Sequence, residues 1–440
     1  MNVASRVASA LPWRRTPRVD GATQTPGGTF RALRHRNYRL FYTGQVISLT
    51  GTWMQTVALA VLVLDLTDSK VALGTVAMLQ FLPITLFVLF AGVLADRVPK
   101  RELIISTRVL AMVQALLMAV LIWTGSIELW HVYVLAFVLG LSNAFEQPAR
   151  QAFVVEMVGR DDLMNAVALN SGMFNAARLV GPAVGGVIIA LFGVKWAFTL
   201  NALSFIPVIL ALTMMNMKEL YSTSGPSRGT GNPLGQLRDG LSFVYRTPPA
   251  MLVVIMMAAI GTFGINFTVM LPLINRYVLD RGAAGLGFMT SAVGLGALAA
   301  AFLLASRSDV TRRALFTGGL AFGLLLLALA VSDVYIVSLL ILVGIGAANI
   351  VFASTANTSL QLTAPDELRG RVMSVYMLLI AGSTPIGGYL TGVIAEWLGV
   401  SAAVAINATI CLLGVGAGAL YYARHRASFA PTSAPITRVS

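Results

Sequence analysis

Twelve long apolar stretches follow one another along this chain of 440 residues, separated by shorter polar segments. A helix needs about 20 apolar residues to cross the hydrocarbon core of a bilayer. None of the stretches shows the short alternating pattern of a barrel strand. We therefore predict an all-α membrane protein with spanning helices at 38–64, 71–95, 103–124, 129–150, 163–191, 194–217, 249–273, 283–305, 312–331, 333–356, 367–396 and 401–422.

The longest internal polar segment divides these stretches into two sets of six. Its Ser/Gly/Pro-rich start is typical of a flexible linker. Leu234, Leu237, Leu241 and Val244 then recur at helical spacing, which indicates a short helix along the membrane surface or, alternatively, an irregular loop. The predicted regions are a disordered cytoplasmic tail at 1–37, an N-terminal six-helix bundle at 38–217, a cytoplasmic linker at 218–248, a C-terminal six-helix bundle at 249–422 and a cytoplasmic tail at 423–440.

The two sets of six carry an internal repeat. The segment that begins at Gly186 recurs from Gly392, 206 positions later. Upstream of it, residues 161–163 are echoed by residues 366–368. These common offsets indicate two homologous halves with the same orientation. Parallel repeats of this kind in transporters enclose a solute site near the bilayer midplane.

The composition excludes a water-soluble protein. Apolar residues make up 57% of the chain, charged residues 11%, and the mean hydropathy is +0.80. Soluble domains carry about 25% charged residues. Such a chain must be solvated by lipid, so a soluble enzyme, a disordered chain and a fibrous repeat are excluded.

The formal net charge of +13 is explained by where the basic residues lie. Of the 31 Lys and Arg, 25 fall in the two tails and in the loops on the same side, against four in the alternate loops. By the positive-inside rule both termini are cytoplasmic. We therefore expect a multi-pass protein of the plasma membrane that attracts anionic lipid and binds no nucleic acid.

The sequence lacks the residues of several chemistries. The single cysteine, Cys411, excludes an intramolecular disulfide framework and a Cys-rich metal site. The sequence contains neither a phosphate-binding loop ending in Gly-Lys-Ser/Thr nor a zinc-binding His-Glu-x-x-His segment. We therefore expect no enzymatic activity, no cofactor and no metal site.

The loop after the second stretch is a candidate conformational latch. A glycine that permits close helix approach precedes one acidic and three basic residues, which can exchange partners when helices shift. The alternative is a solvated basic loop that only sets topology. The candidate gating residues in this loop are Gly92, Asp96, Arg97, Lys100 and Arg101.

The fifth stretch holds a second gating candidate. Gly and Pro recur there at spacings that give a smooth, kinked face for tight helix packing. Generic packing of small residues, with no transport direction implied, is the alternative. The residues concerned are Gly181, Pro182, Gly185 and Gly186.

Arg178 lies about midway along the same stretch. A central arginine costs about 2.5–3.5 kcal/mol on insertion scales, so it should face a polar cavity or a carboxylate. It binds an anionic group of a substrate or modulates a proton carrier. Alternatively, it holds helices together through hydrogen bonds to carbonyls and to amides such as that of Asn175.

Glu146 and Arg108 form a second charged set. Each lies about one turn from the cytoplasmic end of its stretch, so the two can pair across adjacent helices. A carboxylate at this depth can take up and release protons as a cavity opens. The alternative is a static ion pair, or side chains that extend to the interface.

Four neutral side chains are further candidates for the transport pathway, and nearby aromatic residues add apolar surface. Packing is the alternative for each. Together they favour an amphipathic organic substrate over a sugar or an ion. The four are Gln55, Asn143, Asn266 and Asn349.

These motifs resemble those of a known family. Residues 92–101 are similar to the loop signature of the major facilitator superfamily, with Pro99 in place of its second glycine. Residues 181–186 resemble a signature of its exporters. Three further segments resemble bacterial drug and siderophore exporters of the enterobactin-exporter type, and they lie at 30–41, 147–153 and 368–374.

The resemblance implies the major facilitator fold, in which two six-helix bundles rock to give alternating access, and a monomer. It also implies a secondary active exporter of a small amphipathic organic compound, drug-like or siderophore-like, with protons as the coupling ion. Residues 139–143 lack the arginine usual in the fourth span of this superfamily, which is a departure from its standard proton route. An importer or uniporter on the same fold, and a membrane enzyme or sensor without transport, are the alternatives.

Overall fold

The computed structural model describes residues 28, 30–221, 233–305 and 311–429. Within this part of the chain, twelve helices are long and apolar enough to cross a membrane, and there is no strand. The predicted all-α fold with twelve spanning helices is confirmed. The predicted tail over residues 1–27, the start of the linker at 222–232 and the last residues, 430–440, lie outside the described residues.

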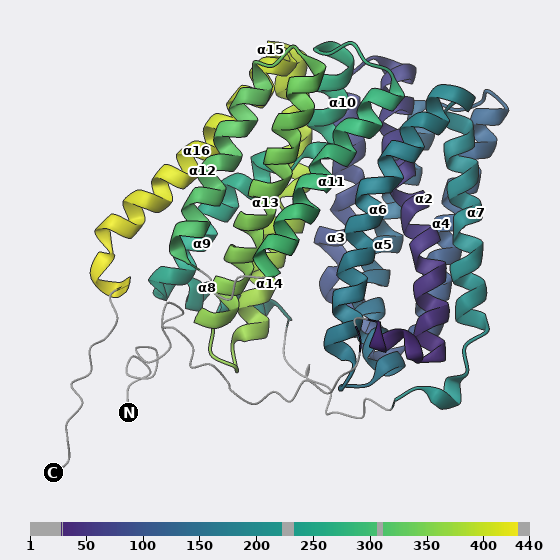
Figure 1. The fold of residues 1–440 in the computed structure, drawn as a ribbon, viewed down its shortest axis with the longest axis horizontal. Helices are drawn as coiled ribbons and strands as arrows, with labels where there is room; N and C mark the ends of the chain where they lie inside the picture. Colours follow the sequence, from purple (N-terminus) through teal and green to yellow (C-terminus); the bar gives the residue numbers. More distant parts are fainter. Residues whose placement is uncertain (1–27, 29, 222–232, 306–310, 430–440) are drawn as a thin grey trace.

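The first six spanning helices form the N-terminal bundle, on the right of Figure 1. A short 3-10 helix, η1 (Arg31–Arg34), precedes them, and another, η2 (Met217–Glu219), follows them. The six are α2 (Arg36–Thr67), α3 (Lys70–Arg97), α4 (Lys100–Trp123), α5 (Leu129–Val158), α6 (Leu163–Phe192) and α7 (Val194–Thr213).

The second six spans form the C-terminal bundle, which α8 (Pro233–Arg246) precedes and η4 (Arg426–Phe429) follows. The seventh span consists of α9 (Pro248–Ala259), η3 (Ile260–Gly264) and α10 (Phe267–Tyr277), and the eleventh of α14 (Arg369–Ala381) and α15 (Thr384–Leu398). The other four are α11 (Ala283–Ala305), α12 (Arg312–Ala330), α13 (Tyr335–Thr363) and α16 (Val400–Arg424).

The bundles stand side by side, and their helices diverge toward the face at which α2 begins and α16 ends (Figure 1). We call this the terminal face and the opposite one the far face. An even number of spans places both of these helix ends on one side, as the topology prediction requires.

Two spans are interrupted near their middle. In the seventh, α9 passes into the π-helical segment η3, and α10 begins after Asn266. In the eleventh, the chain breaks between α14 and α15. The breaks adjoin, since a Cβ on Gly387 would lie 1.6 Å from the Thr262 carbonyl oxygen. The apolar pattern predicts continuous helices over 249–273 and 367–396, so these interruptions correct it. π-helical segments of this kind are frequent at functional sites.

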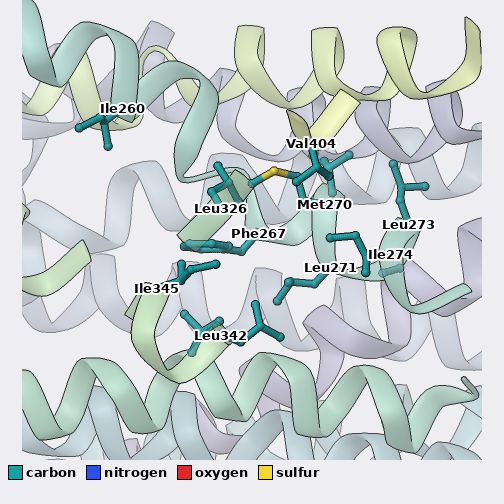
Figure 2. Packing of buried hydrophobic residues seen from close by; sticks show 14 of the residues in the cluster. Ile260, Phe267, Met270, Leu271, Leu273, Ile274, Leu326, Leu342, Ile345 and Val404 are labelled. Atoms are coloured by element: carbon teal, nitrogen blue, oxygen red, sulfur yellow. The ribbon is translucent and has the colours of Figure 1, made fainter. Parts of the chain in front are cut away.

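The core of the C-terminal bundle forms around α10. The ring of Phe267 meets that of Phe322 edge to face, with centroids 6.3 Å apart. This close packing fixes the interrupted span inside its bundle, since van der Waals contact is a main source of helix association in lipid. Figure 2 shows buried side chains of this core, from the seventh span and from the helices packed around it: Ile260, Phe267, Met270, Leu271, Leu273, Ile274, Leu326, Leu342, Ile345 and Val404.

The two bundles meet at a pair of related crossings. Where α6 crosses α11, a Cβ on Gly186 would lie 2.6 Å from the Ala283 carbonyl oxygen. Where α15 crosses α3, a Cβ on Gly392 would lie 2.6 Å from the Lys70 carbonyl oxygen. Gly186 and Gly392 are equivalent positions of the sequence repeat. The repeat is therefore seen in the structure as the same backbone contact made twice.

The repeat also sets two turns at the far face. Gly193 ends α6 with φ 87° and Gly399 ends α15 with φ 89°. This backbone region favours glycine. The recurring glycine 206 positions apart thus marks the same turn in each half.

Some helices are longer than the apolar pattern predicts. The helix α5 continues to Val158 and α13 to Thr363, whereas the pattern ends at 150 and 356. Polar residues interrupt the pattern in both places, so the continuation cannot be detected from hydropathy alone.

The segment that leads into the seventh span is helical, as its leucine spacing predicts. This helix, α8, packs on α14. Arg371 Nη1 lies 2.7 Å from Asp239 Oδ2, and a Cβ on Gly240 would lie 2.4 Å from the Arg371 carbonyl oxygen. A docked helix, rather than an irregular loop, therefore precedes α9.

Candidate functional site

Glu146 of α5 and Arg108 of α4 form an ion pair inside the N-terminal bundle. Their residues are only 5% and 6% exposed. Arg108 also donates from Nη1 to Ser48 Oγ and from Nη2 to Gln45 Oε1, each at 3.2 Å. The sequence predicted the pairing of Glu146 with Arg108, and the structure adds the two partners from α2.

A second cation completes this group. Arg150 Nε lies 3.7 Å from Glu146 Oε1, one turn along α5. The guanidinium of Arg108 also lies 5.7 Å from the centre of the Phe205 ring. One carboxylate is thus shared by two guanidinium groups. Among the described side chains of the spanning helices, Glu146 is the one buried acid.

Arg178 lies on the face of α6 that packs against α2. Its guanidinium is 5.8 Å from the centre of the Trp53 ring, which Phe174 meets edge to face, also at 5.8 Å. Within the described part of the chain, Arg178 has no carboxylate within 4.0 Å and no side-chain hydrogen bond. Asn175 donates instead to the Ser171 carbonyl, at 2.8 Å. The structure therefore does not bring Asn175 and Arg178 together.

Gln55 belongs to a hydrogen-bonded network rather than to a free surface. Its Nε2 donates to Gln114 Oε1 at 3.1 Å, and its Oε1 accepts from Asn201 Nδ2. Asn201 also accepts from Ser204 Oγ. Gln55, Gln114 and Asn201 are all buried, so this network joins α2, α4 and α7.

The three asparagine candidates have oxygen atoms without partners among the described residues. Asn266 stands at the break of the seventh span, where its Nδ2 donates to the Thr262 carbonyl at 2.6 Å and its Oδ1 has no partner. Asn349 Oδ1 of α13 is also buried and unpartnered. Asn143 of α5 is partly exposed and makes no described side-chain hydrogen bond. Their free oxygen atoms can accept hydrogen bonds from a solute.

The sequence predicts a loop over residues 96–102, but only residues 98 and 99 lie between α3 and α4, and the start of α4 binds its own bundle. Lys100 Nζ lies 2.7 Å from Glu156 Oε1 at the end of α5. Arg101 donates to the Leu212 carbonyl at 2.7 Å and to the Thr213 carbonyl at 3.0 Å, which caps the end of α7.

The other gating candidates of this region lie at the end of α3 and take no part in those contacts. A Cβ on Gly92 would meet no atom within 4 Å. The Arg97 side chain is exposed and has no ion pair among the described residues. The side chain of Asp96 lies outside the described part.

The small residues of α6 pack in two directions. Cβ atoms on Gly181 and Gly185 would lie 2.6 and 2.7 Å from side-chain carbons of Trp53 and Met54 on α2. On the other side, Gly186 contacts α11, and a Cβ on Gly287 would lie 2.4 Å from the Pro182 carbonyl oxygen. These residues therefore hold α6 between its own bundle and the opposite one.

Charged groups join the two bundles at the far face. Arg276 lies 2.6 Å from Asp65 and 3.3 Å from Asp68. Tyr277 OH donates to Asp68 Oδ1 at 2.8 Å. The sequence alone does not connect these residues, because their pairing depends on how the halves pack.

A second contact at this face repeats the pattern. The Lys70 backbone N–H donates to Glu396 Oε2 at 2.9 Å, and Lys70 Nζ lies 3.8 Å from the same atom. Among the described residues, every ion pair between the bundles lies at the far face.

Comparison with known proteins assigns the family. The transmembrane secretion effector family matches residues 27–435. The chain belongs to this family, within the major facilitator superfamily.

Two relatives and one solved structure are similar to this chain over most of its length. The multidrug efflux pump Tap of Mycolicibacterium fortuitum is 28% identical, over 83% of this chain and 91% of Tap. The enterobactin exporter EntS of Escherichia coli O81 is 24% identical, over 81% of this chain and 85% of EntS. A bacterial homologue of the iron transporter ferroportin, solved in an inward-facing state, has the same fold, with a TM-score of 0.66. The match covers 88% of this chain and 98% of the homologue, at 15% sequence identity.

The family and these relatives are transporters, so this is a membrane transporter of the major facilitator type and not an enzyme. The predicted similarity to drug and siderophore exporters is confirmed. A small-molecule substrate and a multi-pass position in a membrane follow from the same comparisons.

Proposed function

We propose that this protein exports a small amphipathic organic compound across the plasma membrane by alternating access, in exchange for protons. The closure of the far face carries the proposal. Ion pairs and glycine crossings join the bundles there, while the helices diverge toward the terminal face (Figure 1). A pathway open to one face at a time is what alternating access requires.

The basic loops support a cytoplasmic terminal face with both termini inside. On this assignment the structure corresponds to the inward-facing state, in which the substrate binds from the cytoplasm. Since the pathway lies between two bundles of one chain, a monomer is the transporting unit.

Glu146 is the proposed proton carrier. A proton that neutralises its carboxylate leaves the buried Arg108 guanidinium without its countercharge, which is costly away from water. The change in charge therefore favours a rearrangement that hydrates Arg108 or gives it a new partner. Proton uptake and conformational change become linked at one ion pair.

Arg178 and the asparagines support the proposed substrate class. An unpaired guanidinium beside Trp53 favours a solute with an acidic group and an aromatic or apolar frame. Asn143, Asn266 and Asn349 supply acceptor oxygens. The combination fits an amphipathic organic acid.

The gating residues act on the two faces in turn. In this state Lys100 and Arg101 bind partners of their own bundle. We assign the end of α3, with Gly92, Asp96 and Arg97, and the turn that follows it as the latch that crosses the terminal face in the opposite state. Gly181, Pro182, Gly185 and Gly186 form the close-packed helix about which the bundles move.

Inverted membrane vesicles test this function directly. Fluorescein and rhodamine 123 share a ring system and differ in charge, so their uptake can be compared under an inside-acid gradient. We expect uptake of fluorescein that an uncoupler abolishes and that exceeds uptake of rhodamine 123. Uptake by intact cells down a fluorescein gradient, insensitive to the uncoupler, would establish the importer or uniporter instead.

Labelling of intact cells tests the orientation. A membrane-impermeant maleimide should modify Ser126→Cys, in the exposed turn between α4 and α5, and spare Arg160→Cys, in the exposed turn between α5 and α6. The reverse pattern would invert the proposed direction.

A further inference from the structure

We infer that a cavity at the far face, between the two bundles, binds an amphipathic organic anion and that its occupant holds this face closed. The cavity has a volume of about 430 Å³, within the range of sites for drug-sized ligands. The ends of α2 and α6 and the start of α7 form one wall, and α10 and the start of α11 form the other. It includes none of the residues assigned above to the substrate or the proton.

Asn275 supplies a buried hydrogen-bond acceptor to this cavity. The residue is 4% exposed and lines the cavity. Its Nδ2 donates to the carbonyl oxygens of Arg281 at 2.6 Å and Gly282 at 3.3 Å, which fixes the amide. Its Oδ1 has no partner among the described residues. Buried polar atoms normally have a partner, so a hydroxyl or N–H of a ligand fits here.

Arg281 gives the cavity a cation that has no ion-pair partner among the described residues. The other cation in the wall, Arg276, is already paired with Asp65 and Asp68. Arg281 has no carboxylate within 4.0 Å in the described part of the chain, and its guanidinium lies 5.2 Å from the centre of the Tyr335 ring. A guanidinium in this setting binds a carboxylate, sulfonate or phosphate oxygen.

The remaining lining is largely apolar. Val61, Leu64 and Ile189 come from the N-terminal bundle, and Pro272 and Leu286 from the C-terminal bundle. A carbon frame fits between these walls, with its acidic end at Arg281. This combination defines the ligand class as an amphipathic anion, which can be a soluble organic acid or an anionic lipid.

Both bundles contribute residues to the site, so a bound ligand would hold the far face closed. Opening the far face would separate Ile189 from Leu286 and Asp65 from Arg276, and so dismantle the cavity. A ligand that binds the closed form alone stabilises it by mass action. The inferred inhibition of transport rests on the proposed alternating access, whereas the binding site itself does not.

Dansylglycine is a suitable probe, because dansylethylenediamine offers the same ring system with a positive charge. Fluorescence anisotropy should show saturable binding of dansylglycine, and not of dansylethylenediamine, to the full chain in phosphatidylcholine nanodiscs. Arg281→Gln should weaken binding by about tenfold or more, the size expected for a lost charge-assisted hydrogen bond. Lys195→Gln, a far-face cation outside the cavity, should leave binding unchanged.

A second variant tests the cavity without altering charge. Ala190 lines the cavity and is exposed, so Ala190→Trp should fill the space without disturbing the core. Loss of dansylglycine binding in this variant supports the site. Equal binding by wild type, Arg281→Gln and Ala190→Trp would overturn the assignment.

Spin labels test closure separately. Labels at Ser126→Cys and Asp333→Cys lie in exposed far-face turns of opposite bundles, and the native Cys411 is buried. Dansylglycine should shift the distances between them toward the shorter population. Binding without this shift would refute the closing effect while leaving the site in place, and neither result depends on which compound is exported.

The source of the anion is decided by adding phosphatidylglycerol to the nanodiscs. Competition with dansylglycine would identify lipid as the occupant, and undiminished binding would identify a soluble acid. Either result supports the site, because both ligands share the chemistry that Arg281 and Asn275 recognise.

Discussion

Arg276 Nη1, at the end of α10, lies 2.6 Å from Asp65 Oδ1, at the end of α2. The two residues are 211 positions apart, so this ion pair joins the bundles. Arg276 also approaches Asp68 at 3.3 Å, which places one cation between two acids of the opposite half. These contacts would have to break whenever the far face opens.

Arg276→Gln should therefore favour opening of the far face. Arg276 is 39% exposed in its side chain, and exposed ion pairs contribute about 0.2–1 kcal/mol. The equilibrium should shift by about 1.4- to 5-fold, measured as the spin-label distance distribution between Ser126→Cys and Asp333→Cys. Lys195→Gln is the matched control at the same face. An unchanged distribution in Arg276→Gln would show that the ion pair does not hold the face closed.

Glu146→Gln should remove the coupling of transport to protons. The variant keeps the shape of the side chain but cannot exchange a proton at the carboxylate. Uptake of fluorescein into inverted vesicles should lose its dependence on the pH gradient, while exchange of fluorescein across the membrane without a gradient continues. Glu102→Gln, at the exposed start of α4, is the control. Full gradient-driven uptake by Glu146→Gln would exclude Glu146 as the carrier.

The same variant should lose stability, because it leaves Arg108 buried and unpaired. Breaking one side of a buried ion pair costs about 3–5 kcal/mol. The double variant Arg108→Gln with Glu146→Gln removes both charges and should recover part of the loss in Tm. A double variant no more stable than Glu146→Gln would mean that the two charges do not stabilise one another.

Arg178→Ala should abolish transport of fluorescein and leave membrane insertion intact. The guanidinium is the unpaired cation next to Trp53, so its loss removes the partner of an acidic group. Arg178→Lys keeps the charge and should retain part of the activity, with a higher KM. If Arg178→Ala transports fluorescein normally, Arg178 has a packing role.

Gly186→Ala and Gly392→Ala should each destabilise the contact between the bundles. A Cβ at either position would lie 2.6 Å from a carbonyl oxygen of the opposite half, closer than real Cβ contacts. Overpacking of this kind costs about 1–3 kcal/mol. Both variants should lower Tm, whereas Gly172→Ala, on α6 with no atom within 4 Å, should not. Equal Tm values for all three would contradict the close crossing.

The sequence predicted the number of spans and their pairing into halves because apolar length and the internal repeat are local properties. Arg108 and Glu146 could be paired in advance because both lie near the same end of consecutive spans. Arg150 lies one turn after Glu146, so its approach to the same carboxylate could also be predicted from the sequence. In the sequence it is noted only as part of the segment at 147–153 that resembles exporters.

Other parts of the site depend on packing between distant segments and could not be predicted. Gln55 shows the pattern of a pathway residue, yet Gln114 and Asn201 occupy its polar atoms. The π-helical break before Asn266 lies in an apolar run with no proline at the interruption. Arg276 pairs with Asp65 and Asp68 only because the two bundles pack together, and the sequence does not show how they pack.

Gly186 and Gly392 bring the main chains of the two halves together with no side chain between them. At these two crossings no space is left between the helices for a file of water molecules. With the ion pairs of Arg276 and Lys70 beside these crossings, a carrier closed on this side would hold the voltage across its membrane. The energy stored in that voltage and in the ion gradient would be released only when a complete transport cycle occurs.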